Sequence, residues 1–236
     1  MKSEVSLCMY FRAAFSEPVE ARHREVVANM RMIESPFGWR DVPPPPTPEF
    51  GEESLALYSV YYPQAPKVAC NGLYHFRAAG FMYEDQSCDD NLLIDFDLAK
   101  ARESYRTILH DQFPKMTNAF RAYSSRTSFG LYAVKYEGGV YLTNPIYNSL
   151  KRDKSIDIDG RNNIFTLEPA MYWDALLCKL ALGYDRDEVI RRLQGKVPLV
   201  MPLMDGVYTV FNGDPDLTYE ELVGMKDRFK PLLGVI

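Results

Sequence analysis

From residue 164 onward the chain alternates capped helices with short strands, and this alternation most restricts the folds that the protein can adopt. Two pairs of residues, each three positions apart, open amphipathic segments there: Asp185 with Glu188, and Thr218 with Glu221. Such spacing is typical of a helix N-terminus, where the first side chain accepts a hydrogen bond from a free backbone N–H group. Between these helices, short apolar runs predict strands at Val197–Val200 and Val207–Phe211.

The remainder of the chain mixes the same two kinds of element. Apolar alternation predicts strands at Ser6–Arg12, Leu55–Tyr62 and Leu92–Phe96, whereas helical periodicity is found in Glu17–Ile33 and Arg102–Tyr123. There is no regular strand–helix–strand repeat. The sequence therefore predicts the α+β class, with a mixed, largely antiparallel sheet and helices packed on it.

Turn signals predict several antiparallel hairpins. They are Asn71-Gly72 within Val68–Arg77, Glu137-Gly138-Gly139 between Leu131–Tyr136 and Val140–Thr143, and Asp159–Asn163 between Ile156–Ile158 and Ile164–Leu167. Pro169 predicts the start of a further helix, which carries Trp173 and ends at Gly183 in a left-handed cap.

One domain accounts for the whole chain. Its 236 residues are 47% hydrophobic and 25% charged, which is the composition of a globular protein with a substantial core. Residues 41–50 contain Pro43–Pro46 and Pro48, and we expect a stiff surface loop there. The residues before this loop are too few for an independent domain, so residues 1–236 are expected to form a single unit.

The expected location is the cytoplasm, with no membrane segment. No apolar run reaches the length that spans a bilayer, and Lys2, Glu4 and Arg12 interrupt the apolar stretch that a secretory signal would need. The four cysteines form no CxxC pair and suit reduced, structural thiols.

Charge argues against nucleic acid as the partner. The net charge is −5, with 32 acidic and 27 basic residues, whereas nucleic-acid-binding proteins usually have a basic excess. Two stretches, Glu84–Asp97 and Asp205–Glu221, contain acidic residues and no Lys, Arg or His. They indicate either solvated loops and a helix N-terminus, or a surface that attracts a basic partner by long-range steering.

The sequence contains no complete pattern of a known catalytic site. Asp214–Thr218 spells the DxDxT of aspartyl-phosphate phosphatases after a predicted strand, but too few residues follow it for the lysine and metal-binding acids of that chemistry. His23, His75 and His110 form no metal-binding pair. We therefore predict no catalytic residue, metal or cofactor. The alternative is a small hydrolase or transferase with a site assembled from scattered carboxylates and a histidine.

Part of the chain resembles bacterial immunity proteins, most nearly the Immunity protein 52 family. The similar stretches lie within residues 164–236 and are Phe165–Pro169, Tyr172–Asp174, Asp187–Leu193, Asp205–Tyr208 and Asp214–Leu233. The resemblance implies an α+β protein, encoded beside its toxin, that binds and neutralises a toxin of a polymorphic or type VI secretion system. Toxins linked to this family are often nucleases, whose basic groove would match an acidic inhibitor surface.

On this hypothesis the toxin-binding candidates are the aromatic anchor Trp39 and a set of acidic residues from the two acid-only stretches. The acidic candidates are Asp89, Asp90, Asp95, Asp97, Asp214, Asp216 and Glu220. Trp173 is expected in the core because its predicted helix has a strong apolar stripe. A third hypothesis is an adaptor whose ligand is the proline-rich loop. The sequence indicates neither the oligomeric state nor the toxin's chemistry.

Overall fold

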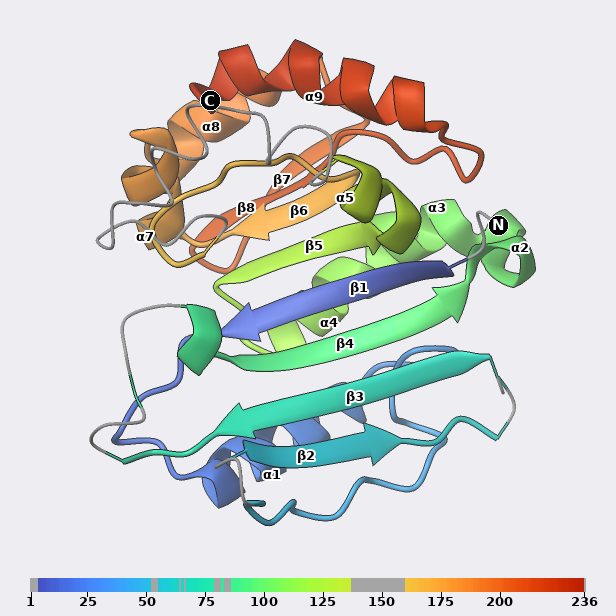
Figure 1. The fold of residues 1–236 in the computed structure, drawn as a ribbon, viewed down its shortest axis with the longest axis vertical. Helices are drawn as coiled ribbons and strands as arrows, with labels where there is room; N and C mark the ends of the chain where they lie inside the picture. The colour runs from blue at the N-terminus through green and yellow to red at the C-terminus, as the bar shows by residue number, and fades with distance from the viewer. Residues whose placement is uncertain are drawn as a thin grey trace.

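A computed structural model of the protein describes residues 4–51, 55–63, 65, 67–78, 82, 86–136 and 160–235. Its strands form one eight-stranded sheet in the order β2-β3-β4-β1-β5-β6-β8-β7, with antiparallel neighbours throughout (Figure 1). The strands are β1 (Glu4–Phe11), β2 (Leu55–Val60), β3 (Val68–His75), β4 (Asp90–Asp97), β5 (Ser124–Phe129), β6 (Ala170–Trp173), β7 (Leu199–Leu203) and β8 (Gly206–Val210). The predicted α+β class, with an antiparallel sheet in one domain, is confirmed.

Helices of unequal length connect these strands. They are α1 (Val19–Met30), α2 (Leu98–Ala101), α3 (Tyr105–Thr107), α4 (Phe113–Ala119), α5 (Gly130–Tyr136), α7 (Ala175–Leu177), α8 (Arg186–Leu193) and α9 (Tyr219–Leu233), with π-helical turns at Ile108–Gln112 and Cys178–Leu182 and 3-10 turns at Gln86–Cys88 and Arg102–Ser104. In the described part of the chain, none of them is long and apolar enough to span a membrane.

One face of the sheet packs against α1 and α4. The strand positions that point to this side are apolar, and Val5, Leu7 and Met9 of β1 are fully buried there. They alternate with less buried residues because successive side chains of a strand point to opposite faces. Figure 1 shows α1 and α4 behind the strands.

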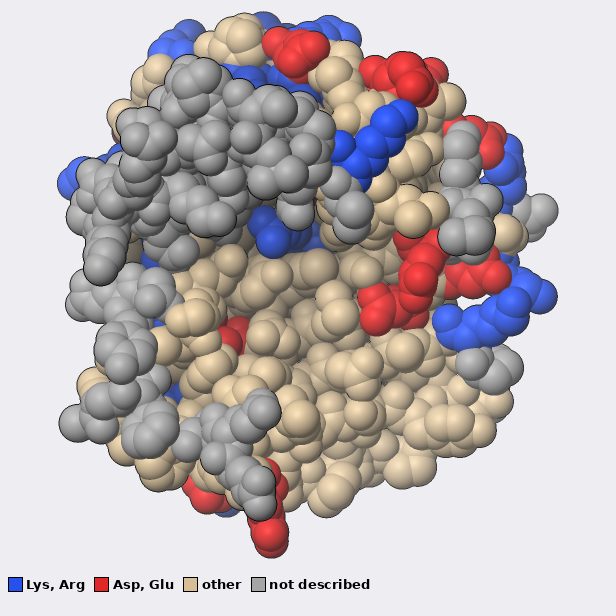
Figure 2. Space-filling model, viewed as in Figure 1, with Lys and Arg blue, Asp and Glu red and all other residues tan. Residues whose placement is uncertain are grey.

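The other face is covered only at one end by described elements. Trp173 of β6 packs on Phe211, and Phe211 packs on Phe229 of α9, with ring centroids 6.2 and 5.1 Å apart. Over β2, β3, β4 and β1 this side is uncovered by any described helix, and we call it the open face. Figure 2 shows it as a broad surface of mostly uncharged side chains.

The predicted helix caps are confirmed. The Asp185 side chain accepts a hydrogen bond from the backbone N–H of Glu188 at 2.8 Å, at the start of α8. Thr218 and Glu221 form a reciprocal capping box at the start of α9. Gly183 has a φ of 74° and ends the preceding helical segment, as predicted.

The predicted hairpin at Asn71-Gly72 is wrong. Both residues lie in the middle of the continuous strand β3. Gly72 is required there for another reason: a Cβ atom would lie 1.9 Å from the ring of Tyr58, which faces it across β2 and β3. The glycine makes room for an aromatic side chain, whereas the sequence pattern indicated a turn.

The predicted helix from Pro169 is also wrong in its first part. Ala170–Trp173 forms β6, which is hydrogen-bonded to β5 on one side and to β8 on the other. The helix begins only at Ala175, after Asp174 caps it by accepting from the N–H of Leu177. Strand pairing on both sides and full burial of Trp173 outweigh the helical spacing of the apolar residues.

The two later hairpins are not borne out where the structure describes them. Leu131–Tyr136, predicted as a strand, lies in α5, where Tyr132 stacks on Phe129 with ring centroids 5.8 Å apart. Ile164–Leu167 forms no strand. The other predicted parts of these hairpins, which are residues 137–139, 140–143 and 156–159, lie outside the described residues.

The proline-rich segment runs across the surface as an extended connector. Residues 43–49 belong to no helix or strand, and most of them are exposed. Pro45 is the buried exception, and its carbonyl oxygen lies 3.0 Å from Nε2 of the buried His23. This contact ties the connector to α1.

Candidate interaction site

The predicted site residues separate into an interior group and a surface group. Asp89 belongs to the interior group: it is 1% exposed, and its carboxylate accepts hydrogen bonds from Tyr123 Oη at 2.6 Å and Arg161 Nε at 2.8 Å. Burial is the largest influence on the pKa of Asp89 and raises it to about 6, although Arg161 and Tyr123 oppose the shift. The expectation that Asp89 belongs to an exposed acidic surface is wrong.

Asp90 is also interior. It is fully buried and forms two hydrogen bonds with the Arg77 guanidinium, at 2.8 and 2.5 Å, while Arg22 Nε lies 4.0 Å away. Asp90 also accepts from the backbone N–H of His75 at 3.1 Å. The carboxylate joins β4 to β3 and α1, so it too is wrongly predicted as a surface residue.

Trp39 lies in the core and not at an interface. It is fully buried, and its Nε1 donates to Tyr62 Oη at 3.1 Å, which donates in turn to the Phe37 carbonyl at 2.8 Å. This chain of hydrogen bonds satisfies the polar atom of the indole inside the protein. Trp39 therefore offers no exposed anchor, and Trp173 is buried as predicted.

Asp95 and Asp97 reach the surface at the end of β4, on the open face. Glu4 of β1 is directly opposite Asp97 in the register of the two strands, and Ser6 is opposite Asp95. Ser6 Oγ donates to Asp95 at 2.5 Å, and Glu4 is exposed. We call Glu4, Asp95 and Asp97 the acidic corner.

Asp97 has two further contacts. Its side chain caps α2 by accepting from the N–H of Ala99 at 3.0 Å, and the Lys67 Nζ lies 3.5 Å from its other oxygen. The acidic corner thus brings three carboxylates together, and the Lys67 ammonium group lies near one of them, Asp97. Like charges that face each other across two strands oppose folding.

The second acidic stretch lies on the same side of the molecule, around the end of α2. Asp216 forms a bidentate ion pair with Arg102, which follows α2 directly, and both side chains are more than half exposed. Glu220 lies 3.8 Å from Lys135 Nζ, and Asp214 is exposed beside Asp216. Figure 2 shows acidic and basic side chains side by side along this edge.

This surface is therefore of mixed charge. Exposed ion pairs of this kind contribute little to stability, but each one neutralises an acid. The structure brings Asp95, Asp97, Asp214, Asp216 and Glu220 to one side of the molecule, and the acidic corner places three carboxylates on adjacent strands there.

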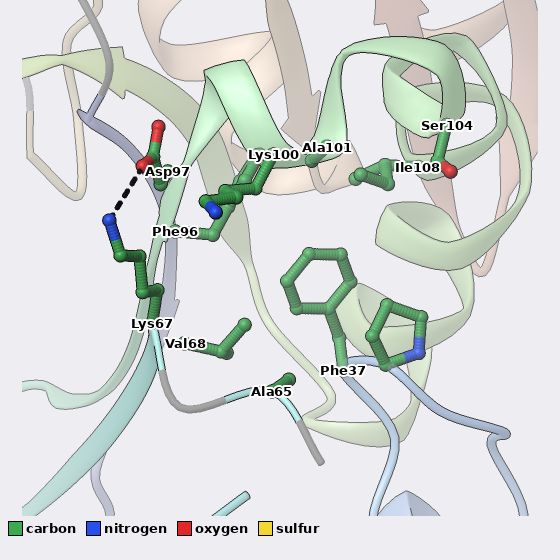
Figure 3. Close-up of a pocket in the computed structure, with 11 residues that line it drawn as sticks. Phe37, Ala65, Lys67, Val68, Phe96, Asp97, Lys100, Ala101, Ser104 and Ile108 are labelled. Atoms are coloured by element: carbon green, nitrogen blue, oxygen red, sulfur yellow. Dashed lines mark hydrogen bonds and ion pairs between the residues drawn. The ribbon is translucent and has the colours of Figure 1, made fainter.

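A pocket opens next to the acidic corner and shares Asp97 with it (Figure 3). Its volume is about 380 Å³, and Phe37, Phe96 and Ile108 contribute apolar walls. Lys67 and Lys100 also line it, together with the Ser104 hydroxyl. An apolar cavity with a few polar groups at its rim can receive a small ligand or a protruding side chain.

His23 is buried and lies among hydrogen-bond partners of the core. Both ring nitrogens of His23 have partners, since Nδ1 lies 3.1 Å from Tyr74 Oη. Burial lowers the pKa of His23. Among the described residues, no group of three His, Cys, Asp or Glu side chains could hold a metal ion.

Glu4, Lys67 and Lys100 also belong to this site and were not predicted from the sequence. Glu4 belongs to a different strand from the acid-only stretches, and Lys67 lies in the connection before β3. The apolar–polar alternation of β1 and β4 places Glu4 and Asp95 on one side of their own strands, but only the register of the pair brings the two strands together.

Comparison with known proteins adds a structural likeness. The fold is similar to that of the Pseudomonas aeruginosa T6SS protein PA0821, with a TM-score of 0.52 and 9% sequence identity, over 98% of this chain and 76% of that one. At this identity the likeness concerns the fold alone. No family model and no curated protein matches the chain, so the resemblance to Immunity protein 52 stays a prediction.

Proposed function

We propose that this protein is an immunity protein, which binds a cognate antibacterial toxin in the cytoplasm of the producing cell and neutralises it without catalysis. The observation that carries the proposal is the acidic corner. Glu4, Asp95 and Asp97 lie together on an end of the sheet that no described helix covers, and their like charges repel one another there. The cations of a basic partner would attract these carboxylates and offset their mutual repulsion.

Two further observations support the same function. The C-terminal part of the sequence resembles immunity proteins, and the fold is similar along nearly the whole chain to that of a type VI secretion (T6SS) protein. A nuclease toxin of such a system would present a basic, phosphate-binding groove. An acidic corner would steer that groove into contact and raise the association rate.

The association rate with the toxin encoded beside this gene tests the proposal. In the triple variant Glu4→Gln, Asp95→Asn and Asp97→Asn, the shape of the corner is kept and asparagine can still cap α2. We expect association to slow about tenfold at low salt, and its dependence on salt to become shallower, because steering is screened within about 10 Å at 0.1 M salt. Stopped-flow fluorescence with the purified toxin measures both effects.

A second triple variant controls for total charge. Asp111→Asn, Asp187→Asn and Asp227→Asn remove three exposed acids elsewhere on the surface. We expect the rate of this variant to stay within about twofold of the original protein. The proposal fails if the toxin forms no complex with the original protein. Equal slowing by both triple variants would show that overall charge, and not the acidic corner, governs binding.

A further inference from the structure

The open face carries a group of leucines beside the acidic corner. Leu57 of β2 is directly opposite Leu73 of β3, and Leu93 of β4 is opposite Asn71, two positions along β3 from Leu73. Since residues two apart on a strand share a face, these three side chains lie across three adjacent strands on one side of the sheet. Leu55, two residues before Leu57, extends the group. We call Leu55, Leu57, Leu73 and Leu93 the leucine patch.

No described element covers this patch. Leu57 is 66% exposed, and the other three leucines are partly exposed. Their neighbours on the same face include Ser59 and Asn71, whose side chains hydrogen-bond to each other at 2.7 Å. The patch is therefore an apolar area bordered on this side by uncharged polar side chains, and Figure 2 shows few charged residues over this part of the open face.

The leucine patch and the acidic corner are continuous along β4. Leu93, Asp95 and Asp97 are alternate residues of this strand and lie on the same face, in that order. An apolar centre with a charged rim is the usual arrangement of a specific protein interface. The leucine patch is not explained by the fold, because the apolar residues that build the core of these strands point to the opposite side.

We propose that the leucine patch is the apolar centre of the toxin interface, and that the acidic corner is its charged rim. This inference rests on the proposed function and names the chemistry of the partner's surface: apolar side chains flanked on one side by lysine or arginine. The rim would accelerate encounter, and the patch would determine how long the complex lasts.

Charge complementarity favours such a partner over a second copy of this chain. A symmetric pair would use the same surface twice, so both copies would bring their carboxylate excess into one interface. A basic-rimmed toxin would meet the acidic corner with opposite charge and the leucines with apolar surface. One surface of the toxin would thus satisfy both features.

The dissociation rate of the complex with the toxin encoded beside this gene tests the inference. Leu57→Arg places a cation within the patch, against the partner's apolar side chains. We expect dissociation to become at least tenfold faster, with little change in folding because Leu57 is exposed on an edge strand. Leu176→Arg is the matched control, since Leu176 is 50% exposed on α7, and its dissociation rate should stay within twofold of the original.

Hydrogen exchange of the original protein provides a measurement that needs no variant. On addition of the toxin, we expect slower exchange in peptides from β2 and β3, and unchanged exchange in peptides from α8. If Leu57→Arg and Leu176→Arg dissociate alike and β2 and β3 gain no protection, the leucine patch is not the interface, even where the acidic-corner variant shows that the toxin binds. Absence of any complex overturns the proposed function and this inference together.

The alternative to a toxin interface is that the leucine patch binds a second copy of this chain. Sedimentation equilibrium of the protein alone distinguishes the two. We expect a monomer at micromolar concentration. A dimer that Leu57→Arg converts to monomer would assign the leucine patch to a second copy of this chain and overturn the inference.

Discussion

At the scale of single residues, the burial of ionisable side chains decides which acids can meet a partner. Asp90 lies against Arg77, and Glu168 pairs with Lys226 at 2.7 Å, with both members of each pair nearly or fully buried. A buried carboxylate requires such a partner, because an isolated charge is costly to remove from water. Acids of this kind hold the fold together, whereas the acidic corner remains on the surface.

The pH dependence of stability provides a test of the buried state of Asp89. Its pKa is about 6 in the folded protein and 3.8 in an unfolded chain, so the folded state binds the proton more tightly. The stability that this group contributes is full below pH 4 and is lost as the pH rises through 6. Relative to Asp89→Asn, the original protein should lose on the order of 2–3 kcal/mol between pH 4 and pH 7.

Urea unfolding of both proteins at several pH values measures this difference. Comparing the two proteins removes the contributions of all other titrating groups, and any pH-independent effect of the substitution cancels. A constant difference between pH 4 and pH 7 would show that Asp89 titrates normally and is not buried as described.

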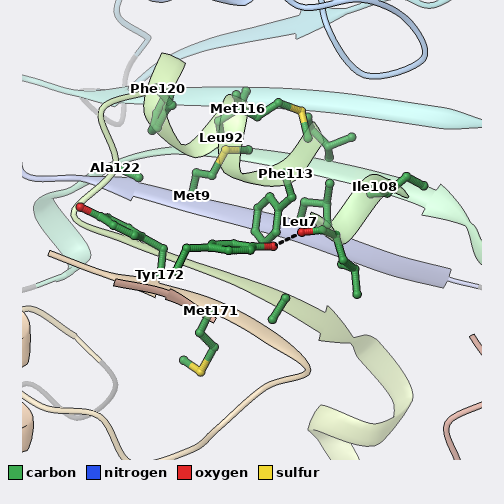
Figure 4. Packing of buried hydrophobic residues seen from close by; sticks show 14 of the residues in the cluster. Leu7, Met9, Leu92, Ile108, Phe113, Met116, Phe120, Ala122, Met171 and Tyr172 are labelled. Carbon is green, nitrogen blue, oxygen red and sulfur yellow. Dashed lines mark hydrogen bonds between the residues drawn. The ribbon is translucent and has the colours of Figure 1, made fainter. Parts of the chain in front are cut away.

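At the scale of elements, side-chain size sets how strands and helices can pack. Helix α4 lays Phe113 and Met116 over Leu7 and Met9 of β1 (Figure 4). On β3 no side chain fits at Gly72, since the ring of Tyr58 occupies the space that any side chain would need. Such contacts lie between segments far apart in the sequence. The side-chain size that fits at one position therefore depends on a residue of another element.

Replacement of Gly72 tests this packing. We expect Gly72→Ala to destabilise the protein by about 1–3 kcal/mol, because Tyr58 must leave its place against Tyr74, on which it stacks. Gly224→Ala is the control: nothing lies within 4 Å of the added Cβ in α9, and alanine favours a helix by roughly 0.5–1 kcal/mol over glycine. We expect urea unfolding to show a lower free energy of unfolding for Gly72→Ala and a higher one for Gly224→Ala. Destabilisation by both substitutions would contradict the explanation.

At the scale of the whole molecule, one continuous sheet joins both ends of the chain. Cys70 lies in β3 near one edge, and Cys178 follows β6 in the other half. Burial raises the pKa of each thiol to about 12. Since the thiolate is the reactive form, both thiols should be unreactive until the protein unfolds.

Thiol labelling therefore tests whether the sheet unfolds as one unit. We expect all four cysteines, which are buried and form no disulfide, to resist a thiol reagent at pH 8 and to become reactive at the same urea concentration. Mass spectrometry of labelled peptides identifies each site. Labelling of Cys70 at clearly lower urea than Cys178 would show that the two halves unfold separately.

The predictions that the structure confirms depend on neighbours in the sequence. The caps at Asp185 and Thr218 require only hydrogen bonds within three residues, and the left-handed glycine at Gly183 requires only its own backbone freedom. The α+β class follows from the mixture of such local patterns. These interactions form in almost any tertiary context, so the amino-acid pattern was sufficient to predict them.

The remaining features depend on contacts between distant segments. Asp89 and Asp95 belong to the same acid-only stretch, but Asp89 is buried against Arg161, while the pairing of β4 with β1 leaves Asp95 on the surface opposite Ser6. Pairing with β5 and β8 likewise made a strand of the segment around Trp173. Local sequence cannot specify which side chain meets a distant cation or which face of a sheet a helix covers, because those free energies arise only when the chain is folded.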